Sequence, residues 1–280
     1  MSTSDIQSPN FPESRKAGDP LELTLYGVKA IFRYCPPGTF LMGSPVDEKG
    51  RGYDETPHEV TLTRGFWLLE TPVTQAIWEA VKLGQIFAGR SFADWWNKKI
   101  LMRGLMRGIR ECNPSRFQGM DARPVESVSW KKCDEFIRKL NNAEVAPDVL
   151  FDFPTEAEWE YACRAGTTTR YNSGDELTED DANFAKTFDG TTPVRSFAPN
   201  AWGFYDMHGN VGEWCSDWYG VYPKESTRDP QGSKSGSDRV VRGGCWGVSA
   251  KYCRSAFRFD YDPSLRSSLI GFRLALRSLN

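Results

Sequence analysis

Apolar and polar residues alternate along two early stretches of the chain, and this pattern predicts two β-strands. Residues 21–33 and 60–69 both alternate in this way, and turn-forming residues bound each stretch. Near the C-terminal end, residues 271–276 (Gly-Phe-Arg-Leu-Ala-Leu) predict a closing strand. Long segments without a clear period separate these strands, so the pattern indicates a loop-rich domain.

Three helix starts are predicted from hydroxyl side chains that can cap a first turn. Thr74 and Ser129 precede apolar-periodic segments that extend to residues 82 and 140. Thr155 begins the third helix, and Glu158 stands three residues later, where it can complete a capping box. We therefore expect a fold that combines a few helices with scattered strands.

Residues 83–112 form an insertion whose apolar residues recur at roughly helical spacing. Trp95, Trp96, Ile100, Leu101, Leu105 and Ile109 make up this apolar set, and lysines and arginines supply a basic remainder. We expect a helical excursion that packs on the domain. The alternative is a helix that docks on a partner or lies on a membrane surface.

Composition is that of a globular protein rich in aromatic side chains. Of 280 residues, 39% are hydrophobic and 13% aromatic, which is enough for one sizeable core. A formal net charge of -2 argues against a nucleic-acid surface, and no apolar run approaches the roughly 20 residues of a membrane-spanning helix. We expect one domain over residues 21–280, preceded by a flexible segment, residues 1–20.

Cysteine usage leans towards a reducing compartment without deciding the location. The seven cysteines are dispersed and include no CxxC pair, which favours free thiols over a disulfide framework. No signal peptide or transmembrane segment is present in this sequence. The protein is expected at the cell surface if an export or lipoprotein signal has been removed, and in the cytoplasm otherwise.

Several motifs occur in a fixed order along most of the chain. They are FLMGS (residues 40–44), NPSRF (113–117), PVESVSW (124–130), PTEAEWEYACRAG (154–166), GFYDMHGNVGEWCSDW (203–218) and the closing IGFRLA (270–275). Together they resemble the formylglycine-generating-enzyme family. The resemblance implies an α+β, C-type-lectin-like fold with few regular strands, but not one function, because the fold hosts both oxidases and binding proteins.

The resemblance reduces the question of oxidase activity to two positions. Catalytic members hold copper between two cysteines, because soft thiolates select Cu(I). When the glycine pair Gly243-Gly244 is used to align the segment, Cys253 falls on the second cysteine and Val248 on the first. Cys245 lies three residues earlier than Val248, at the wrong spacing. We therefore expect no catalytic copper site and no enzyme activity.

Iron chemistry is also not expected. Iron-dependent sulfoxide synthases with a similar domain need three histidines, whereas this chain has two, His58 and His208, both of which suit loop or core roles. There is also no nucleophile elbow, phosphate loop or HExxH motif. We expect no catalytic cofactor.

The C-terminal segment, residues 242–277, resembles the variable region of a bacterial diversity-generating-retroelement protein. The frame Arg-Gly-Gly-Cys-Trp, Cys-Arg-Ser-Ala-x-Arg, Pro-x-x-Arg and Ile-Gly-Phe-Arg-Leu-Ala is close to that pattern, with Cys245 where Ser is usual. The resemblance implies that adenine-directed mutagenesis rewrites the positions between the frame residues. Of those positions, all but Lys251 hold residue types that a randomised AAC codon can encode.

These positions are predicted to form a ligand-binding surface. They are Gly247, Val248, Ser249, Lys251, Tyr252, Phe257, Phe259, Asp260, Tyr261, Asp262, Leu265, Ser267, Ser268 and Leu269. Rigid aromatic side chains beside small polar ones suit recognition of varied ligands. The alternative is an ordinary strand with one buried face at residues 257–261, although the aspartates and Pro263 indicate a loop.

A calcium site is also implied by the family resemblance. In relatives, the loop that matches residues 206–213 wraps Ca2+, and here Asp206 and Glu213 would supply carboxylates while Gly209 and Val211 would supply backbone oxygens. The alternative is that Asp206 caps a turn and Glu213 pairs with an arginine.

The sequence as a whole predicts a non-catalytic, sequence-diversified binding protein. Its ligand is expected to be a macromolecule, a protein rather than a nucleic acid, and the protein is expected to be a monomer. The alternative is a formylglycine-generating-type oxidoreductase or a degenerate relative of one.

Overall fold

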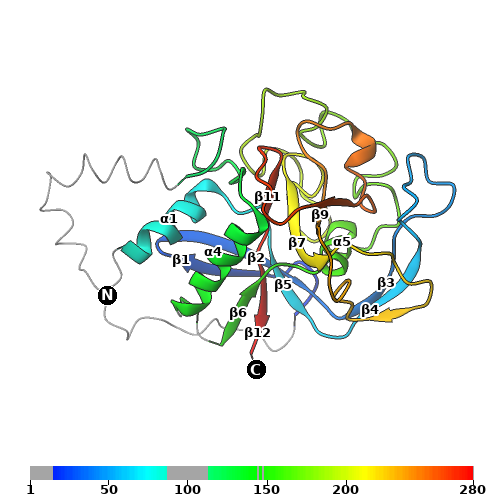
Figure 1. Cartoon of the computed structure of the whole chain (residues 1–280), viewed down its shortest axis with the longest axis horizontal. Coiled ribbons are helices and arrows are strands. Elements are labelled where there is room, and N and C mark those ends of the chain that lie inside the picture. The colour runs from blue at the N-terminus through cyan, green and yellow to red at the C-terminus, as the bar shows by residue number, and fades with distance from the viewer. Residues whose placement is uncertain (1–14, 87–112, 144, 147, 280) are drawn as a thin grey trace, which may run out of the picture.

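Three β-sheets and a small number of helices make up the described part of the chain, residues 15–86, 113–143, 145–146 and 148–279 of a computed structural model (Figure 1). The strands are β1 (Pro20–Leu25), β2 (Val28–Cys35), β3 (Gly38–Met42), β4 (His58–Leu62), β5 (Phe66–Leu69), β6 (Val149–Asp152), β7 (Gly212–Trp218), β8 (Thr227–Arg228), β9 (Arg239–Arg242), β10 (Phe259–Tyr261), β11 (Ile270–Phe272) and β12 (Ala275–Ser278). The helices are α1 (Gln75–Ile86), α4 (Trp130–Asn142), α5 (Glu156–Arg164) and the 3-10 helix η2 (Ala250–Tyr252).

Two of the sheets are mixed and the five-stranded one is antiparallel, and each combines segments that are distant in sequence. The five-stranded sheet has the order β1-β2-β5-β12-β6, the four-stranded sheet β10-β9-β7-β11 and the three-stranded sheet β3-β4-β8. Strands β11 and β7 pair in parallel, as do β4 and β8, while the other pairs are antiparallel. The C-terminal segment therefore contributes strands to two sheets.

Each predicted strand is in fact a pair of strands. Residues 21–33 fall in the β1–β2 hairpin, where Tyr26 and Gly27 have φ angles of 48° and 89°. Cross-strand partners share one face of the sheet, so the buried positions change from odd numbers in β1 (Leu21, Leu25) to even numbers in β2 (Ala30, Phe32) at this turn. Residues 60–69 are divided between β4 and β5, which belong to different sheets, and the closing strand is divided into β11 and β12.

All three helix starts are confirmed. Thr74 Oγ1 accepts from the amide of Ile77 at 3.3 Å, and Ser129 Oγ accepts from that of Lys132 at 3.3 Å. Thr155 and Glu158 form the predicted capping box, with distances of 3.1 and 2.8 Å. Helix α1 continues beyond the predicted end to residue 86, and residues 87–112 of the predicted insertion lie outside the described residues.

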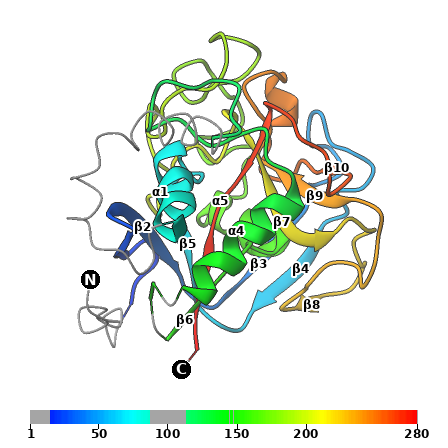
Figure 2. The same ribbon diagram turned by 60° about the vertical axis from the view of Figure 1, so that its left-hand side comes forward.

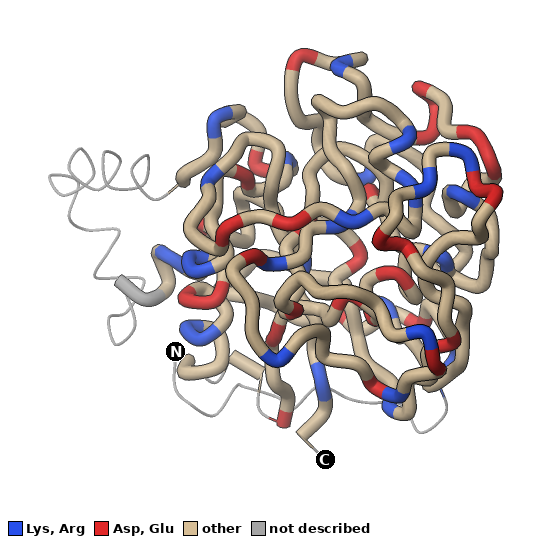
Figure 3. The backbone as a smooth tube through the Cα atoms, turned by 45° about the vertical axis from the view of Figure 1, so that its right-hand side comes forward, with Lys and Arg blue, Asp and Glu red and all other residues tan. Residues whose placement is uncertain are grey.

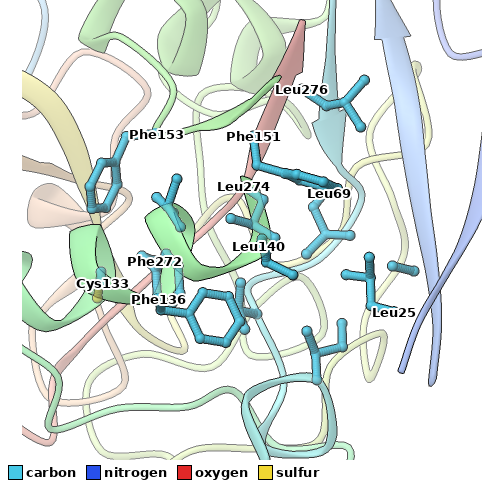
Figure 4. Packing of buried hydrophobic residues seen from close by; sticks show 14 of the residues in the cluster. Leu25, Leu69, Cys133, Phe136, Leu140, Phe151, Phe153, Phe272, Leu274 and Leu276 are labelled. Atoms are coloured by element: carbon cyan, nitrogen blue, oxygen red, sulfur yellow. The ribbon is translucent and has the colours of Figure 1, made fainter. Parts of the chain in front are cut away.

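The main core joins the two larger sheets beneath α1 and α4 (Figure 4). Trp78 of α1 stacks on Phe136 of α4 with ring centroids 4.9 Å apart, and Phe136 meets Phe272 of β11 edge-on at 5.5 Å. A second cluster around Trp159 of α5 fills the space beside the three-stranded sheet. Because Phe272 belongs to the four-stranded sheet, this core fixes the sheet that carries the C-terminal segment.

Strand β10 lies at one edge of the four-stranded sheet, beside β9 (Figure 2). It follows η2 in the chain and precedes the turn at residues 262–265. These two segments are therefore attached directly to the four-stranded sheet through β10. No helix in the described part of the chain is long and apolar enough to cross a membrane.

Candidate binding surface

Four arginines of the C-terminal segment are buried, and each forms ion pairs with glutamates from earlier parts of the chain. The pairs are Arg242 with Glu156 and Glu160, Arg254 with Glu48 and Glu55, Arg258 with Glu156, and Arg273 with Glu213. The arginine side chains are between 0% and 2% exposed. Because a planar guanidinium fixes both distance and orientation, these pairs determine the path of the segment.

Arg254 shows how complete this anchoring is. Its two terminal nitrogens donate to the two carboxylate oxygens of Glu55 at 2.6 and 2.8 Å, and further bonds reach the carbonyls of Gly50 and Lys251. Burial alone would raise the pKa of Glu55, but hydrogen bonds from Arg254 and Ser44 lower that pKa below its ordinary value. The pair is therefore charged at neutral pH.

The glycine pair at the start of the segment is required by close packing. Gly243 and Gly244 have φ angles of 91° and 71°, which side-chain-bearing residues rarely adopt. A Cβ on Gly244 would lie 2.5 Å from Cys253 Sγ and 2.8 Å from the carbonyl oxygen of Tyr252. The glycines therefore allow η2 to pack against the end of β9.

Burial separates the predicted variable residues from the frame residues. Every predicted variable residue is half-buried or exposed, including Lys251, Asp260, Asp262 and Leu265, which are exposed. The frame residues Cys253–Ala256, by contrast, are at most 1% exposed. Trp246, Ala250 and Arg266 are the frame residues that depart from this rule, since the first two are half-buried and Arg266 is exposed. The predicted side chains are thus accessible at the surface, although Phe259, Tyr261 and Leu269 also pack against the main core.

Four aromatic side chains of this set form a continuous row. Ring centroids are 5.1 Å apart for Tyr252 and Phe257, 4.7 Å for Phe257 and Phe259, and 6.0 Å for Phe259 and Tyr261. Phe259 and Tyr261 also rest against the main core, and Tyr261 meets Trp214 edge-on. The row combines exposed ring area with limited freedom of movement, as a binding surface requires.

Residues 259–261 form strand β10. The expectation of a loop at these residues is therefore wrong, and the backbone follows the stated alternative, a strand. Strand pairing with β9 places Phe259 opposite Val241 and Tyr261 opposite Arg239. Neither aromatic residue is fully buried, and Asp260 between them is exposed. The strand therefore presents its residues at the surface instead of forming part of the interior.

The second half of the predicted surface is held by backbone bonds. Asp262 accepts from the amide of Ser264 at 2.7 Å and forms the turn that carries Leu265. Ser267 and Ser268 contribute carbonyl oxygens to Ser127 N and to Trp246 Nε1 at 2.9 and 3.0 Å. The Ser268 side chain is not used in these bonds, whereas Ser267 Oγ also accepts from the amide of Leu269 at 3.2 Å.

Val248 occupies the position at which catalytic relatives are expected to carry the first copper cysteine. It is half-buried and packs against Phe184 and Cys253 in a small apolar cluster. Burial raises the pKa of Cys245 to about 11 and raises that of Cys253 as well. Both thiols are therefore protonated at neutral pH, and the residues do not fit a paired-thiolate copper site.

Both carboxylates expected to bind calcium accept hydrogen bonds from protein groups in this structure. Glu213 is fully buried, and its oxygens accept from Arg273 at 2.8 and 2.9 Å and from Trp159 Nε1 at 2.7 Å. Asp206 accepts from the amide of Arg195, and burial raises its pKa to about 6. Within the described ranges, no group of three metal-ligating side chains occurs. Binding of calcium by this loop, with the Gly209 and Val211 carbonyls among its ligands, stays a prediction.

The glutamate partners of Arg242, Arg254 and Arg258 were missed by sequence reasoning, whereas the alternative that Glu213 pairs with an arginine is confirmed by Arg273. Glu48, Glu55, Glu156 and Glu160 belong to two distant stretches of the chain. A signal was present, since Arg242, Arg254, Arg258 and Arg273 stand among small and apolar residues and buried arginines need acidic partners. Nothing in the sequence, however, indicated which acids these were.

The family model for the sulfatase-modifying factor enzyme 1-like domain matches residues 32–278. The chain belongs to this family. It is 32% identical to the formylglycine-generating enzyme of Streptomyces coelicolor, over 86% of this chain and 87% of that protein. The family thus includes an enzyme of similar length.

Solved structures of similar fold extend the comparison within the sulfatase-modifying factor family. Treponema denticola variable protein 1 superposes with a TM-score of 0.73 and 28% identity, over 91% of this chain and 98% of that one. PvdO from Pseudomonas aeruginosa gives a TM-score of 0.72 and 26% identity, over 94% of this chain and 100% of that one. Family membership therefore fixes the mixed, helix-poor fold and leaves the function to the residues of the C-terminal segment.

Proposed function

We propose that this protein is a non-catalytic binding protein whose C-terminal segment, on a C-type-lectin-like scaffold, is diversified in sequence and recognises a protein ligand. The observation that carries the proposal is the separation of buried frame residues from accessible variable positions within residues 242–277. The similarity to Treponema denticola variable protein 1 supports it.

Substitutions at variable positions and at frame positions differ in how much stability they cost. Replacing a half-buried or exposed side chain changes stability by at most about 0.5 kcal/mol in most contexts, whereas replacing a buried charged partner costs several kcal/mol. Variable positions such as Ser249, Asp260 and Leu265 fall in the first class, and Arg254 and Arg258 fall in the second. A segment built in this way can change its surface without losing its backbone.

The chemistry of the surface favours a protein as ligand. An aromatic row flanked by Asp260, Asp262 and small hydroxyl groups is similar to the composition of antibody binding loops. Lysines and arginines are intermixed with acidic residues along the described part of the chain (Figure 3), and the formal net charge of -2 also disfavours a nucleic acid as ligand. We propose that the protein acts as a monomer towards such a ligand.

An oxidoreductase of the formylglycine-generating type is the second candidate, favoured by the 32% identity to the Streptomyces coelicolor enzyme. The residues at the corresponding site argue against it, because Val248 cannot ligate copper and the Cys253 thiol is buried. Incubating the purified protein with Cu(I) and a cysteine-containing peptide, and measuring aldehyde formation, separates the two candidates. Aldehyde formation above the level of a Cys253→Ser control would support the enzyme.

The genetic test of the proposal examines the DNA beside the gene. A near-identical copy of the codons for residues 242–277 is expected there, with AAC or AAT at the positions of Tyr252, Phe257, Phe259, Asp260, Tyr261 and Leu269. Differences between the two copies should be confined to adenines. A genome without such a copy, or with differences spread over all four bases, would contradict diversification.

A protein-level test follows from the same separation. A display library that randomises the variable positions should remain folded in most members and should yield binders to unrelated proteins. A matched library that randomises an equal number of frame positions should lose folded protein. Equal folding of the two libraries would refute the division of roles.

A further inference from the structure

Seven acidic side chains are buried in the described part of the chain, and most of them are neutralised by arginine. They are Glu55, Glu70, Glu126, Glu156, Glu160, Glu213 and Asp217. All except Glu126 and Asp217 form an ion pair with an arginine within these residues. Because a buried charge without a partner is costly, these two acids call for another explanation.

Glu126 is satisfied by other donors, whereas Asp217 is satisfied on one side only. Both oxygens of Glu126 accept, from the amide of Phe117 at 2.8 Å and from the hydroxyl of Ser127 at 2.7 Å. On Asp217, Oδ2 accepts from the amide of Glu156 and from the hydroxyl of Ser216, while no hydrogen bond to Oδ1 is found among the described residues. Asp217 is only 3% exposed.

Asp217 lines a cavity of about 450 Å³ between the end of β7 and the 220–233 segment. The cavity has the size of a small-molecule site. A second unused polar atom lines it, because Thr227 Oγ1 is buried and has no hydrogen-bond partner among the described residues. Trp218, Tyr222 and Val221 supply apolar walls.

Of the arginines close to this cavity, Arg228 lines it and is exposed, whereas Arg258 and Arg239 are already engaged. Arg258 directs its guanidinium to Glu156 and to the carbonyls of Asp54 and Gly220. Arg239 lies between the rings of Trp130 and Trp218, at 3.9 and 3.6 Å from their centroids, and donates to the carbonyl of Ser216. Neither residue forms an ion pair with Asp217 within the described residues.

We infer that this cavity binds a small organic ammonium ion, whose charged head pairs with Asp217 Oδ1 and hydrogen-bonds Thr227 Oγ1 while its apolar body rests on Trp218 and Tyr222. The buried acids that pair with arginine already have a cation beside them, and an ammonium ion would supply one to Asp217. The aromatic walls favour a cation as well. Apart from Arg258, none of the residues of the C-terminal segment lines the cavity, so this site is separate from the proposed variable surface.

The pKa of Asp217 supports the geometry. Burial, and then the charge of Glu156, raise this pKa to about 7. Glu158 adds to the rise, and the charges of Arg228 and Arg258, which also line the cavity, disfavour a bound cation. Binding of an ammonium ion should therefore release a proton near neutrality and should weaken as the pH falls below about 7.

The test compares two probes of equal size on the full chain. By isothermal titration calorimetry at pH 8, 2-phenylethylammonium should bind at least about tenfold more tightly than the uncharged 2-phenylethanol. Asp217→Asn should reduce the ammonium affinity about tenfold or more and leave the alcohol unchanged. Glu126→Gln, the same change at the other arginine-free buried acid, should leave both affinities unchanged.

Three results would overturn the inference. They are the absence of ammonium binding at millimolar concentration, equal affinity for the two probes, and an equal loss in the Asp217 and Glu126 variants. If Asp217→Asn fails to fold, the pair of probes and the pH series on the unmodified protein still decide the question. If the variable-surface libraries failed to fold or to yield binders, these results on the cavity would not change. The two proposals can therefore fail separately.

Discussion

Replacing Arg254 by methionine tests whether the buried ion pairs hold the C-terminal segment. Methionine supplies an apolar side chain of similar length, and the substitution removes every bond to Glu55, Gly50 and Lys251. Glu55 would remain 0% exposed with only Ser44 and Gly52 as donors. Leaving one member of a buried pair without its partner costs about 3 to 5 kcal/mol.

A loss of this size is directly measurable. For a protein of this length, each kcal/mol lowers Tm by roughly 2–4 °C, so Arg254→Met should lower Tm by roughly 6–20 °C in a calorimetric scan. Arg266→Met is the matched control, because Arg266 is an exposed frame arginine whose Nε donates to the Ser127 carbonyl. Its change should stay within about 0.5 kcal/mol. Equal effects of the two substitutions would refute the reasoning.

The pH dependence gives a second readout for the same variant. In the unmodified protein the pKa of Glu55 is lowered, so its contribution to the free energy of unfolding is complete above the unfolded-state value and is lost as the pH falls through the folded value. In Arg254→Met, burial would raise that pKa, and stability would fall as the pH rises. The difference between the two proteins should therefore be largest at neutral pH and smaller at pH 4.

Three further predictions concern single positions. In chemical denaturation, Gly244→Ala should destabilise the protein by roughly 1–3 kcal/mol more than Gly166→Ala. Both glycines have positive φ, but only Gly244 has atoms within 4 Å of an added Cβ. Equal losses would argue against close packing of η2. The raised pKa of Asp217 means that the folded protein holds its proton more tightly than the unfolded chain, so stability should fall as the pH rises from about 4 to about 7 and should level off above; Asp217→Asn should flatten this slope, and an unchanged slope would contradict the assignment. Removal of calcium with EGTA should leave Tm within 1 or 2 °C, roughly, because Arg273 already neutralises Glu213; a larger fall would show that the loop does hold the ion.

Local features of the fold could be predicted from the sequence, and long-range ones could not. The helix caps at Ser129 and Thr155 involve residues three apart, so the sequence contains the whole interaction. The β1–β2 hairpin was overlooked because Tyr26 gives no strong turn signal. Arg254 and Glu55 are 199 residues apart, and no local pattern links them.

The surface was predictable for a different reason. Its positions were identified by the frame around them and by residue types such as Phe259, Asp260 and Tyr261, not by any periodicity, and their accessibility agrees with that choice. The cavity at Asp217 left no trace in the sequence. In the sequence, Asp217 is one more polar residue of a strand. It becomes distinctive only in the structure, where no ion pair between it and an arginine is found among the described residues.

The alternation of roles around Arg258 shows how one short segment can be both fixed and variable. Arg258 is buried and bonded to Glu156, while Phe257 and Phe259 on either side of it are half-buried and contact each other. In extended backbone, successive side chains point to opposite sides, so an inward arginine necessarily turns its neighbours outward. The ion pair therefore does more than stabilise the fold. It sets which side chains face outward, whatever those side chains are.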